Sequence, residues 1–158
     1  MIRSYANSED TQYVVESHCR IYCADYGYDD SFVEFIVQAV EDFEKHRDAT
    51  KENIWLVETG GSRKGSIAIV KYTEEAAQLR WFLLEPEVRN QGYGKQLLQA
   101  ALQFCRENQY KCVFLWTNDS LTAARALYES FGFQVVKRKT RSLPDQTLNE
   151  EKWELILD

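Results

Sequence analysis

The chain has 158 residues, enough for one ordinary domain with a well-covered core and too few for two. Its composition, 44% hydrophobic and 28% charged, excludes a disordered chain, and no apolar run is long enough to span a bilayer. Because 19 lysines and arginines stand against 25 aspartates and glutamates without any basic block, the net charge of −6 argues against nucleic acid as a partner. We therefore expect a single domain over residues 1–158, with no nucleic-acid or membrane partner.

The first residues, MIRSYANSEDTQ, contain no apolar core of a signal peptide, which makes the cytoplasm the expected location. The four cysteines form no CxxC pair, and Cys19 and Cys23 lie four residues apart within a helical pattern. This usage is typical of buried free thiols rather than of metal ligands or disulfides. We expect no metal site.

The first third of the chain predicts a short strand followed by two helices. Residues 1–6 have the character of an edge strand, and Asp10 or Thr11 is a suitable N-cap for a helix that reaches about Tyr26. From Asp30 a second helix repeats apolar residues at three- and four-residue steps and turns its glutamates away from them. The apolar residues of this second helix form one stripe that we expect to be buried.

The middle of the chain predicts an antiparallel meander. Strands are expected at residues 54–58 and 66–72, joined by the turn-rich sequence GGSRKG. A third strand, residues 78–84, ends where Pro86 can no longer donate to a ladder.

The last part of the chain predicts helices that alternate with strands. One helix runs to about Asn108, a strand covers residues 112–116, and a second helix covers residues 121–130 and stops at Gly132. The segments FQVVKRK and WELIL are the last strands. A meander followed by crossover connections implies α/β packing around a mixed sheet.

The stretch VRNQGYGK, residues 88–95, carries two of the seven glycines of the chain between a strand and a helix. It is not a dinucleotide fingerprint, which would need glycine at Leu97, nor a P-loop, which would need serine or threonine at Gln96. A strand end, glycines and the free N–H groups of a helix N-terminus nevertheless favour a bound anion.

Two signatures in the chain resemble those of the GNAT superfamily of N-acetyltransferases. Arg89-x-x-Gly92-x-Gly94 is similar to the RxxGxG/A signature that cradles the pyrophosphate of acetyl-coenzyme A, and AARALYESFGF, residues 123–133, is similar to the AxxLYxxxGF signature. The resemblance implies the GNAT fold, with a central mixed, mostly antiparallel sheet of six or seven strands and four helices. It also implies acetyl-coenzyme A as the cosubstrate.

The second signature departs from the family at one point. Many relatives carry asparagine three residues before the alanine at position 124, where this chain has Leu121, and Asn118, one turn away, is expected to compensate. The combination of LRWFLLEP with VFLWTNDSLTAARALYESFGF looks most like the acetyltransferase half of bacterial proteins that fuse a GNAT domain to a MarR-type DNA-binding domain. Only that half is implied here.

The resemblance places the cofactor mainly against backbone. The N–H groups of residues 91–95 would hold the pyrophosphate, and residues 82–84 would pair with the pantetheine arm like an added strand. Arg89 either adds charge to the phosphates or is a solvated residue at the helix start. The expected cofactor-binding residues are Phe82, Leu83, Leu84, Arg89, Asn90, Gln91, Gly92, Tyr93, Gly94, Lys95, Asn118, Ala124 and Tyr128.

The resemblance also implies two catalytic groups. Tyr128, inside the matched LYxxxGF, would protonate the departing thiolate, and the backbone N–H of Leu83 would meet the oxyanion. The alternative for Tyr128 is a helix tyrosine that packs on the sheet.

The proton of the acceptor amine lacks an evident base. Many relatives carry a glutamate early on the strand before the loop, and Gln78 stands at that position. Glu74, Glu75, Glu85 or a chain of water molecules would then take the proton, unless binding the neutral amine suffices.

The acceptor side is predicted from strand alternation and from the resemblance. Alternation puts Gln78, Arg80 and Phe82 on one face and Leu79, Trp81 and Leu83 on the other. Arg80 would then hold a carboxylate of an amino-acid-like acceptor, or else pair with a neighbour in the sheet. Since the first two helices line the acceptor cleft in the family, the expected substrate-binding residues are Tyr26, Tyr28, Gln78 and Arg80.

We expect an enzyme that transfers an acetyl group from acetyl-coenzyme A to a primary amine of a small molecule or peptide, by direct attack and without a metal. One alternative is an acyl-coenzyme A binding or sensing module with weak or no catalysis, and another is a partner-binding subunit with an acidic surface. A homodimer is left open.

Overall fold

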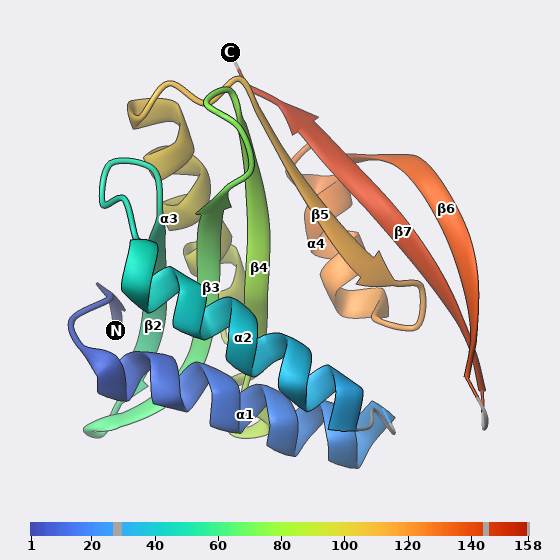
Figure 1. Cartoon of the computed structure of the whole chain (residues 1–158), viewed down its shortest axis with the longest axis horizontal. Helices are drawn as coiled ribbons and strands as arrows, with labels where there is room; N and C mark the ends of the chain where they lie inside the picture. Colours follow the sequence, from blue (N-terminus) through green and yellow to red (C-terminus); the bar gives the residue numbers. More distant parts are fainter. Residues whose placement is uncertain (27–29, 144–145, 158) are drawn as a thin grey trace.

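The protein, described by a computed structural model over residues 1–26, 30–143 and 146–157, is built around one twisted sheet (Figure 1). Its elements are β1 (Ile2–Ser4), α1 (Ser8–Tyr26), α2 (Asp30–His46), β2 (Asn53–Thr59), β3 (Ser62–Lys71), β4 (Ala76–Leu84), the 3-10 turn η1 (Pro86–Val88), α3 (Tyr93–Glu107), β5 (Cys112–Asn118), α4 (Thr122–Ser130), β6 (Gln134–Leu143) and β7 (Gln146–Ile156).

The seven strands lie in the order β1-β2-β3-β4-β5-β7-β6. All neighbouring pairs are antiparallel except β4 and β5, which are parallel. Helices α1 and α2 cover one face of the sheet, and α3 and α4 lie on the other (Figure 1). The predicted α/β architecture, with a mixed, mostly antiparallel sheet and four α-helices in the described residues, is confirmed.

Each face of the sheet has its own apolar core, because successive residues of a strand point to opposite faces. In β2, Ile54 and Leu56 pack under α1 and α2, whereas Trp55 and Val57 pack under α3. The α3 core is the larger one, and it extends across β5 and β7 to α4. Burial of these side chains at about 25 cal/mol per Å² of apolar surface holds the helices in place.

The cysteines are free thiols, as expected from their spacing. Burial is confirmed for Cys105 alone, because Cys19, Cys23 and Cys112 are half-buried. The prediction that all four are buried is therefore wrong for three of them.

Strand β4 contains a β-bulge at Trp81. Ala68 of β3 pairs with Arg80 and Ser66 pairs with Leu83, so that one residue of β3 faces two residues of β4. Trp81 has a φ of 51°, in the left-handed region that bulky residues rarely adopt. The backbone of β4 is therefore irregular in its second half.

The bulge overturns the predicted alternation of β4. Arg80 lies on the α2 face, with its guanidinium carbon 5.3 Å from the ring centroid of Phe35, and Trp81 packs into the core of that same face. Phe82 lies on the opposite face, with its ring centroid 6.1 Å from that of Tyr128 on α4. The prediction that Arg80 and Phe82 share a face is wrong, because the extra residue shifts the side-chain period by one.

Strands β4 and β5 separate toward their carboxyl ends. Only the first residues are in register, since Ala76, Ala77 and Gln78 pair with residues 112–114. Among the described residues, β4 makes no pairing with β5 beyond Gln78, and the two strands diverge (Figure 1). The second half of β4 therefore has backbone groups along one edge that β5 does not pair with.

Helix α1 begins earlier than predicted, at Ser8, where the side-chain oxygen of Asn7 accepts from the N–H of Glu9 at 3.0 Å. The predicted N-cap at Asp10 or Thr11 is therefore wrong. Asp10 instead lies within the first turn of the helix, 0% exposed, where it binds arginines from the sheet.

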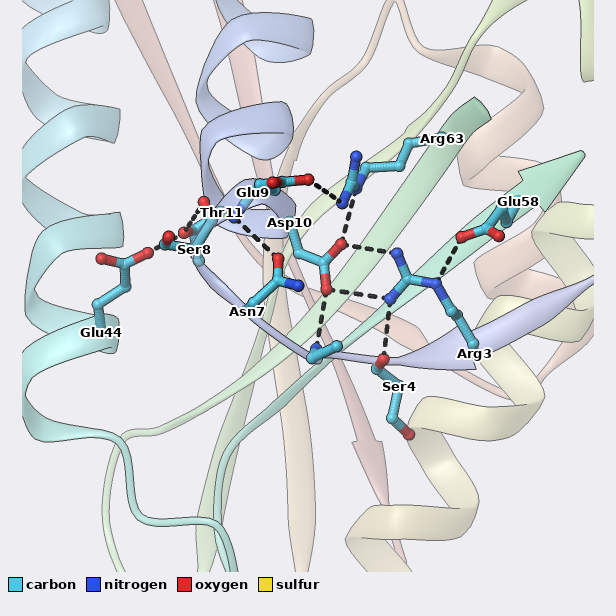
Figure 2. A network of polar contacts seen from close by, with 11 residues as sticks. Arg3, Ser4, Asn7, Ser8, Glu9, Asp10, Thr11, Glu44, Glu58 and Arg63 are labelled. Atoms are coloured by element: carbon cyan, nitrogen blue, oxygen red, sulfur yellow. Dashed lines mark hydrogen bonds and ion pairs between the residues drawn. The ribbon is translucent and has the colours of Figure 1, made fainter. Parts of the chain in front are cut away.

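Asp10 joins α1 to two parts of the sheet (Figure 2). Its carboxylate accepts from Arg3 on β1 at 2.8 and 3.0 Å, from Arg63 on β3 at 2.7 Å and from the N–H of Ala6 at 2.8 Å. Burial alone would raise the pKa of Asp10, but the hydrogen bonds from the two arginines hold it well below its usual range. This network attaches the first turn of α1 to β1 and β3.

Candidate active site

The loop between β4 and α3 leaves the N-terminus of α3 uncapped. The N-cap residue is Gly92, in the left-handed conformation at φ 86°, and no side chain of the described residues caps the helix. A Cβ added at Gly92 would meet nothing closer than the Gln96 side chain at 4.0 Å, so the space beside it is open. Asn90 is also left-handed, with a φ of 63°.

The first N–H groups of α3 have no acceptor within the helix, and the helix dipole adds a partial positive charge there. The first turn, all of which is described, contains no acidic residue, while Lys95 is exposed beside it. An anion is the natural ligand for such a helix end. The geometry therefore fits the pyrophosphate that the sequence motif predicts at residues 91–95.

Arg89 closes the loop back onto the strand. Its Nε donates to the carbonyl oxygen of Leu84 at 3.0 Å, and the Gln91 side chain donates to the carbonyl oxygen of Glu87 at 3.0 Å. Arg89 is exposed, so its charge remains on the loop surface next to the N-terminus of α3. It therefore has a structural contact that neither sequence interpretation included.

The gap between β4 and β5 begins beside this helix end. A Cβ at Gly94 would lie 3.5 Å from Leu127, 3.6 Å from Leu84 and 3.7 Å from Phe82, so Gly94 faces the same apolar wall. Phe82 and Leu84 are half-buried, and Leu83 between them is buried. The structure thus brings the glycine loop, the second half of β4 and helix α4 together.

Tyr128 on α4 packs near the second half of β4, through Phe82. It is 5% exposed, and its ring centroid lies 5.8 Å from that of Phe133 and 6.1 Å from those of Phe82 and Trp153. Burial, and to a smaller extent the Tyr22 hydroxyl, raise the pKa of Tyr128 well above its usual range. The phenol is therefore protonated at neutral pH, which both a proton donor and a packing residue require.

Two predicted cofactor residues have local roles. Asn118 is buried at the end of β5, and its side-chain oxygen accepts from the N–H of Ser120 at 3.0 Å in the turn to α4. Ala124 is half-buried against the core of the α3 face. Their contacts with a cofactor stay predictions.

The two exposed candidate bases do not lie at the open end of the gap. Glu74 and Glu75 are exposed near the start of β4, where the strand still pairs with β5, and they form ion pairs with Lys71 and Lys111. Neither carboxylate is therefore placed to accept a proton at the open end of the gap.

The third candidate, Glu85, is buried and fully engaged. Its carboxylate accepts from both terminal nitrogens of Arg20 on α1 at 2.8 and 2.9 Å and from the Tyr13 hydroxyl at 2.7 Å. The hydrogen bonds from Arg20 lower the pKa of Glu85 despite its burial. A carboxylate held in this way attaches α1 to the end of β4 and is a poor base at neutral pH.

His18 on α1 was not selected from the sequence. It is 4% exposed, its Nδ1 is 2.7 Å from the carbonyl oxygen of Val14, and its ring stacks on Tyr22 with centroids 5.6 Å apart. The carbonyl fixes Nδ1 as the donor, which leaves a lone pair on Nε2, and that atom is buried without a hydrogen-bond partner in the described residues. The one available signal was that His18 and Tyr22 share a helix face, since they are four residues apart.

His18 should make the protein sensitive to mild acid. Burial lowers its pKa to about 4, an effect that the Val14 carbonyl and the Glu85 carboxylate only partly oppose. The unfolded chain takes up this proton near pH 6.5, so between pH 6.5 and 4 acid favours unfolding, by about 3 kcal/mol in total. We expect the urea midpoint to fall over this range.

Two variants test this assignment. His18→Asn keeps a donor for the Val14 carbonyl and should flatten the profile between pH 4 and 6.5, whereas His46→Asn, at the exposed end of α2, should leave it unchanged. The carboxylates with lowered pKa, among them Asp10, Glu85 and Glu151, contribute a loss of stability only below about pH 4.5. A slope that persists above that pH in His18→Asn would contradict the prediction.

The predicted acceptor residues are only partly described. Tyr28 lies outside the described residues, and Tyr26 is the last residue of α1, with a side chain outside the description. Gln78 is half-buried and is the last residue of β4 that pairs with β5. Arg80 is half-buried and follows it on the α2 face.

Across the described ranges, no three histidine, cysteine, aspartate or glutamate side chains come together as a metal site. In the same residues, no helix combines the length and apolar character needed to cross a membrane.

Comparison with known families decides the class of the protein. The model of the acetyltransferase (GNAT) family matches residues 15–133. The chain belongs to the GNAT family. The matched region runs from α1 to the start of β6 and includes both sequence signatures, so this part of the prediction is confirmed.

Individual GNAT proteins are more distant. N-acetyltransferase family 8 member 2 of Rattus norvegicus is 34% identical over 87 residues, which are 52% of this chain and 38% of the rat protein. A GNAT acetyltransferase from Staphylococcus aureus Mu50 superposes with a TM-score of 0.81 at 20% identity over all of both chains. The Salmonella typhimurium acetyltransferase yncA, solved with acetyl-coenzyme A, superposes with a TM-score of 0.76 at 17% identity. The superposition covers all of this chain and 94% of the yncA chain.

Proposed function

We propose that this protein transfers an acetyl group from acetyl-coenzyme A to a primary amine of a small molecule or peptide. The observation that carries the proposal is the meeting of an uncapped helix N-terminus at Gly92 with the half of β4 that β5 leaves unpaired, where Phe82 packs near Tyr128. Family membership and a structural neighbour solved with acetyl-coenzyme A support the same cosubstrate. The single-domain organisation, the cytoplasmic location and the likeness to MarR–GNAT fusions stay predictions.

Acetyl-coenzyme A supplies a thioester that is activated toward attack by an amine. The N–H groups of residues 92–95, with the charges of Arg89 and Lys95 nearby, would bind its pyrophosphate. The edge of β4 that β5 leaves unpaired would accept the pantetheine amides as an additional strand. Phe82 and Leu84 would cover this arm and exclude water from the reacting carbonyl.

In the transfer itself, the amine nitrogen forms a bond to the acetyl carbon and the carbon–sulfur bond breaks. The oxyanion would be met by a backbone N–H of the bulged segment, with Leu83 the predicted donor. The proton lost by the amine would pass to water, because the described carboxylates near the gap are engaged in ion pairs. Tyr128 would return a proton to the departing sulfur.

A second candidate function is an acyl-coenzyme A binding or sensing module with little catalysis. Gln78 stands where a base is expected from the family, and the three candidate carboxylates Glu74, Glu75 and Glu85 are held in ion pairs. An acyl-coenzyme A binding or sensing module would therefore have the same loop and gap but little catalysis.

Two measurements separate these functions. Acetyl-coenzyme A at a hundred times its dissociation constant should stabilise the fold by about 2.7 kcal/mol and raise the melting temperature by several degrees. An acetyltransferase should release free coenzyme A thiol when it is mixed with acetyl-coenzyme A and a panel of primary amines. A sensing module should release none. Absence of any melting shift with millimolar acetyl-coenzyme A would refute both functions.

A further inference from the structure

Arg80 is half-buried and has no counter-ion among the residues that the structure describes. Its guanidinium carbon lies 5.3 Å from the ring centroid of Phe35 and 5.5 Å from that of Trp81. Among the described residues it forms no ion pair and no hydrogen bond. Of the two sequence interpretations of Arg80, pairing with a neighbour in the sheet is therefore not found.

An arginine in this state has unused binding capacity. Burial lowers the pKa of Arg80, with no carboxylate to oppose the effect, yet a guanidinium remains protonated and offers five N–H donors. The two aromatic rings compensate only part of the lost hydration, since a cation–π contact contributes less than a hydrogen-bonded carboxylate. The energetically natural complement is an anion.

A pocket of about 560 Å³ opens beside Arg80, between α2 and the strands β3 and β4. This is large enough for a molecule of amino-acid size. Phe35 forms part of its wall and is 64% exposed, although its position in the apolar stripe of α2 predicts a buried residue. An exposed aromatic ring thus stands next to an unpaired cation.

The other charged residues of the pocket are already engaged. Asp42 accepts from the Gln38 side chain, Asp48 accepts from Thr50, and Glu52 accepts from the backbone N–H of Lys71. Lys71 itself pairs with Glu74, outside the pocket lining. Within the described part of the chain, Arg80 is therefore the cation of this pocket that lacks a partner, and it stands among several carboxylates. Such a setting favours a singly charged anion over a dianion such as phosphate.

The position of Arg80 connects this pocket to the reaction. It follows Gln78, where β4 and β5 begin to separate, and the bulge keeps it on the α2 face while Phe82 turns to the α4 face. Arg80 therefore lies two residues before Phe82, beside which the thioester is proposed to bind, on the opposite face of β4.

We propose that the acceptor is an amine that also carries a carboxylate, and that Arg80 binds this carboxylate beside the Phe35 ring. The proposal rests on the proposed acetyl transfer and adds the class of its second substrate. It makes Arg80 a residue that determines specificity at the acceptor side.

The test compares acceptors that differ only in this charge. Each standard L-amino acid with a primary amine, together with β-alanine and 4-aminobutanoate, is assayed beside its amide. We expect the best acid to exceed its amide at least tenfold in kcat/KM. Arg80→Gln should raise KM for that acid by 10- to 100-fold, with kcat and the amide reaction changed less than threefold. Arg80→Lys should retain part of the preference.

The controls separate this site from a packing role. Because Arg80→Gln removes a cation that has no partner in the described residues, its melting temperature should equal or exceed that of the unaltered protein. The control Arg141→Gln changes an exposed arginine on β6 that pairs with Glu150, and it should leave kcat/KM for every acceptor unchanged. The proposal would be overturned, while acetyl transfer stands, if every amide had the same kcat/KM as its acid. It would also be overturned if Arg80→Gln lowered kcat/KM equally for the acid and the amide. No acetylation of any amine, despite a melting shift with acetyl-coenzyme A, would instead remove the proposed function and this inference with it.

Discussion

Tyr128→Phe is expected to lower turnover by roughly one to three orders of magnitude and to leave the affinity for acetyl-coenzyme A within a few-fold. The reason is that Tyr128 is protonated and buried beside Phe82, on the α4 side of the strand gap. A positioned proton donor assists the departure of a thiolate without being strictly required, because a thiolate is a reasonable leaving group. The loss should therefore be large but not complete.

A packing tyrosine predicts a different pattern for the same substitution. Phenylalanine keeps the ring contacts with Phe82, Phe133 and Trp153, so only the hydroxyl group is lost, at about 1 kcal/mol of stability. Steady-state kinetics and a melting curve on one preparation distinguish the two roles. Normal turnover with a lowered melting temperature would remove Tyr128 from the catalytic residues.

Tyr110→Phe is the matched control for this experiment. Tyr110 is also buried in the α3 core, and its hydroxyl donates to the carbonyl oxygen of Lys51 at 2.8 Å. It belongs to neither signature. Its loss should lower the melting temperature and leave turnover unchanged.

The regular parts of the fold follow from local periodicity. Strand β2 alternates between two cores, and the apolar side of α3 is buried, because both elements have the periods that their sequences predict. The bulge at Trp81 has no such signal, since nothing in QLRWFLL marks a tryptophan for positive φ. Its position depends on the pairing of β3 with β4, which is a long-range property. Phe82, beyond the bulge, therefore lies on the face opposite to Arg80 although the sequence predicted the same face.

The candidate site likewise has a part that local sequence predicts and a part that depends on contacts made only in the fold. The glycine loop was predictable because an uncapped helix end is encoded by adjacent residues, Gly92 and Gly94 above all. Arg80 gains its character from Phe35 on α2, and His18, itself on α1, gains it from its burial in the folded protein. Whether a polar group lacks a partner is visible only when all of its neighbours are known.

Gly92→Val should reduce the affinity for acetyl-coenzyme A by at least a hundredfold while the protein remains folded. The valine side chain would enter the open space beside the first N–H groups of α3, where the pyrophosphate is proposed to bind. At a φ of 86° the substitution also strains the backbone, by roughly 1–2 kcal/mol. Gly94→Val should act in the same direction, because its Cβ would already touch Leu127 and Leu84.

Gly61→Val separates the strain from the loss of the binding site. Gly61 has a φ of 79°, nothing lies within 4 Å of its added Cβ, and it belongs to the turn between β2 and β3. The backbone strain should therefore be similar, with a similar fall in melting temperature, but titration calorimetry with acetyl-coenzyme A should give the affinity of the unaltered protein. Equal affinities in Gly92→Val and Gly61→Val, both folded by circular dichroism, would place the cofactor away from the N-terminus of α3 and contradict the proposed site.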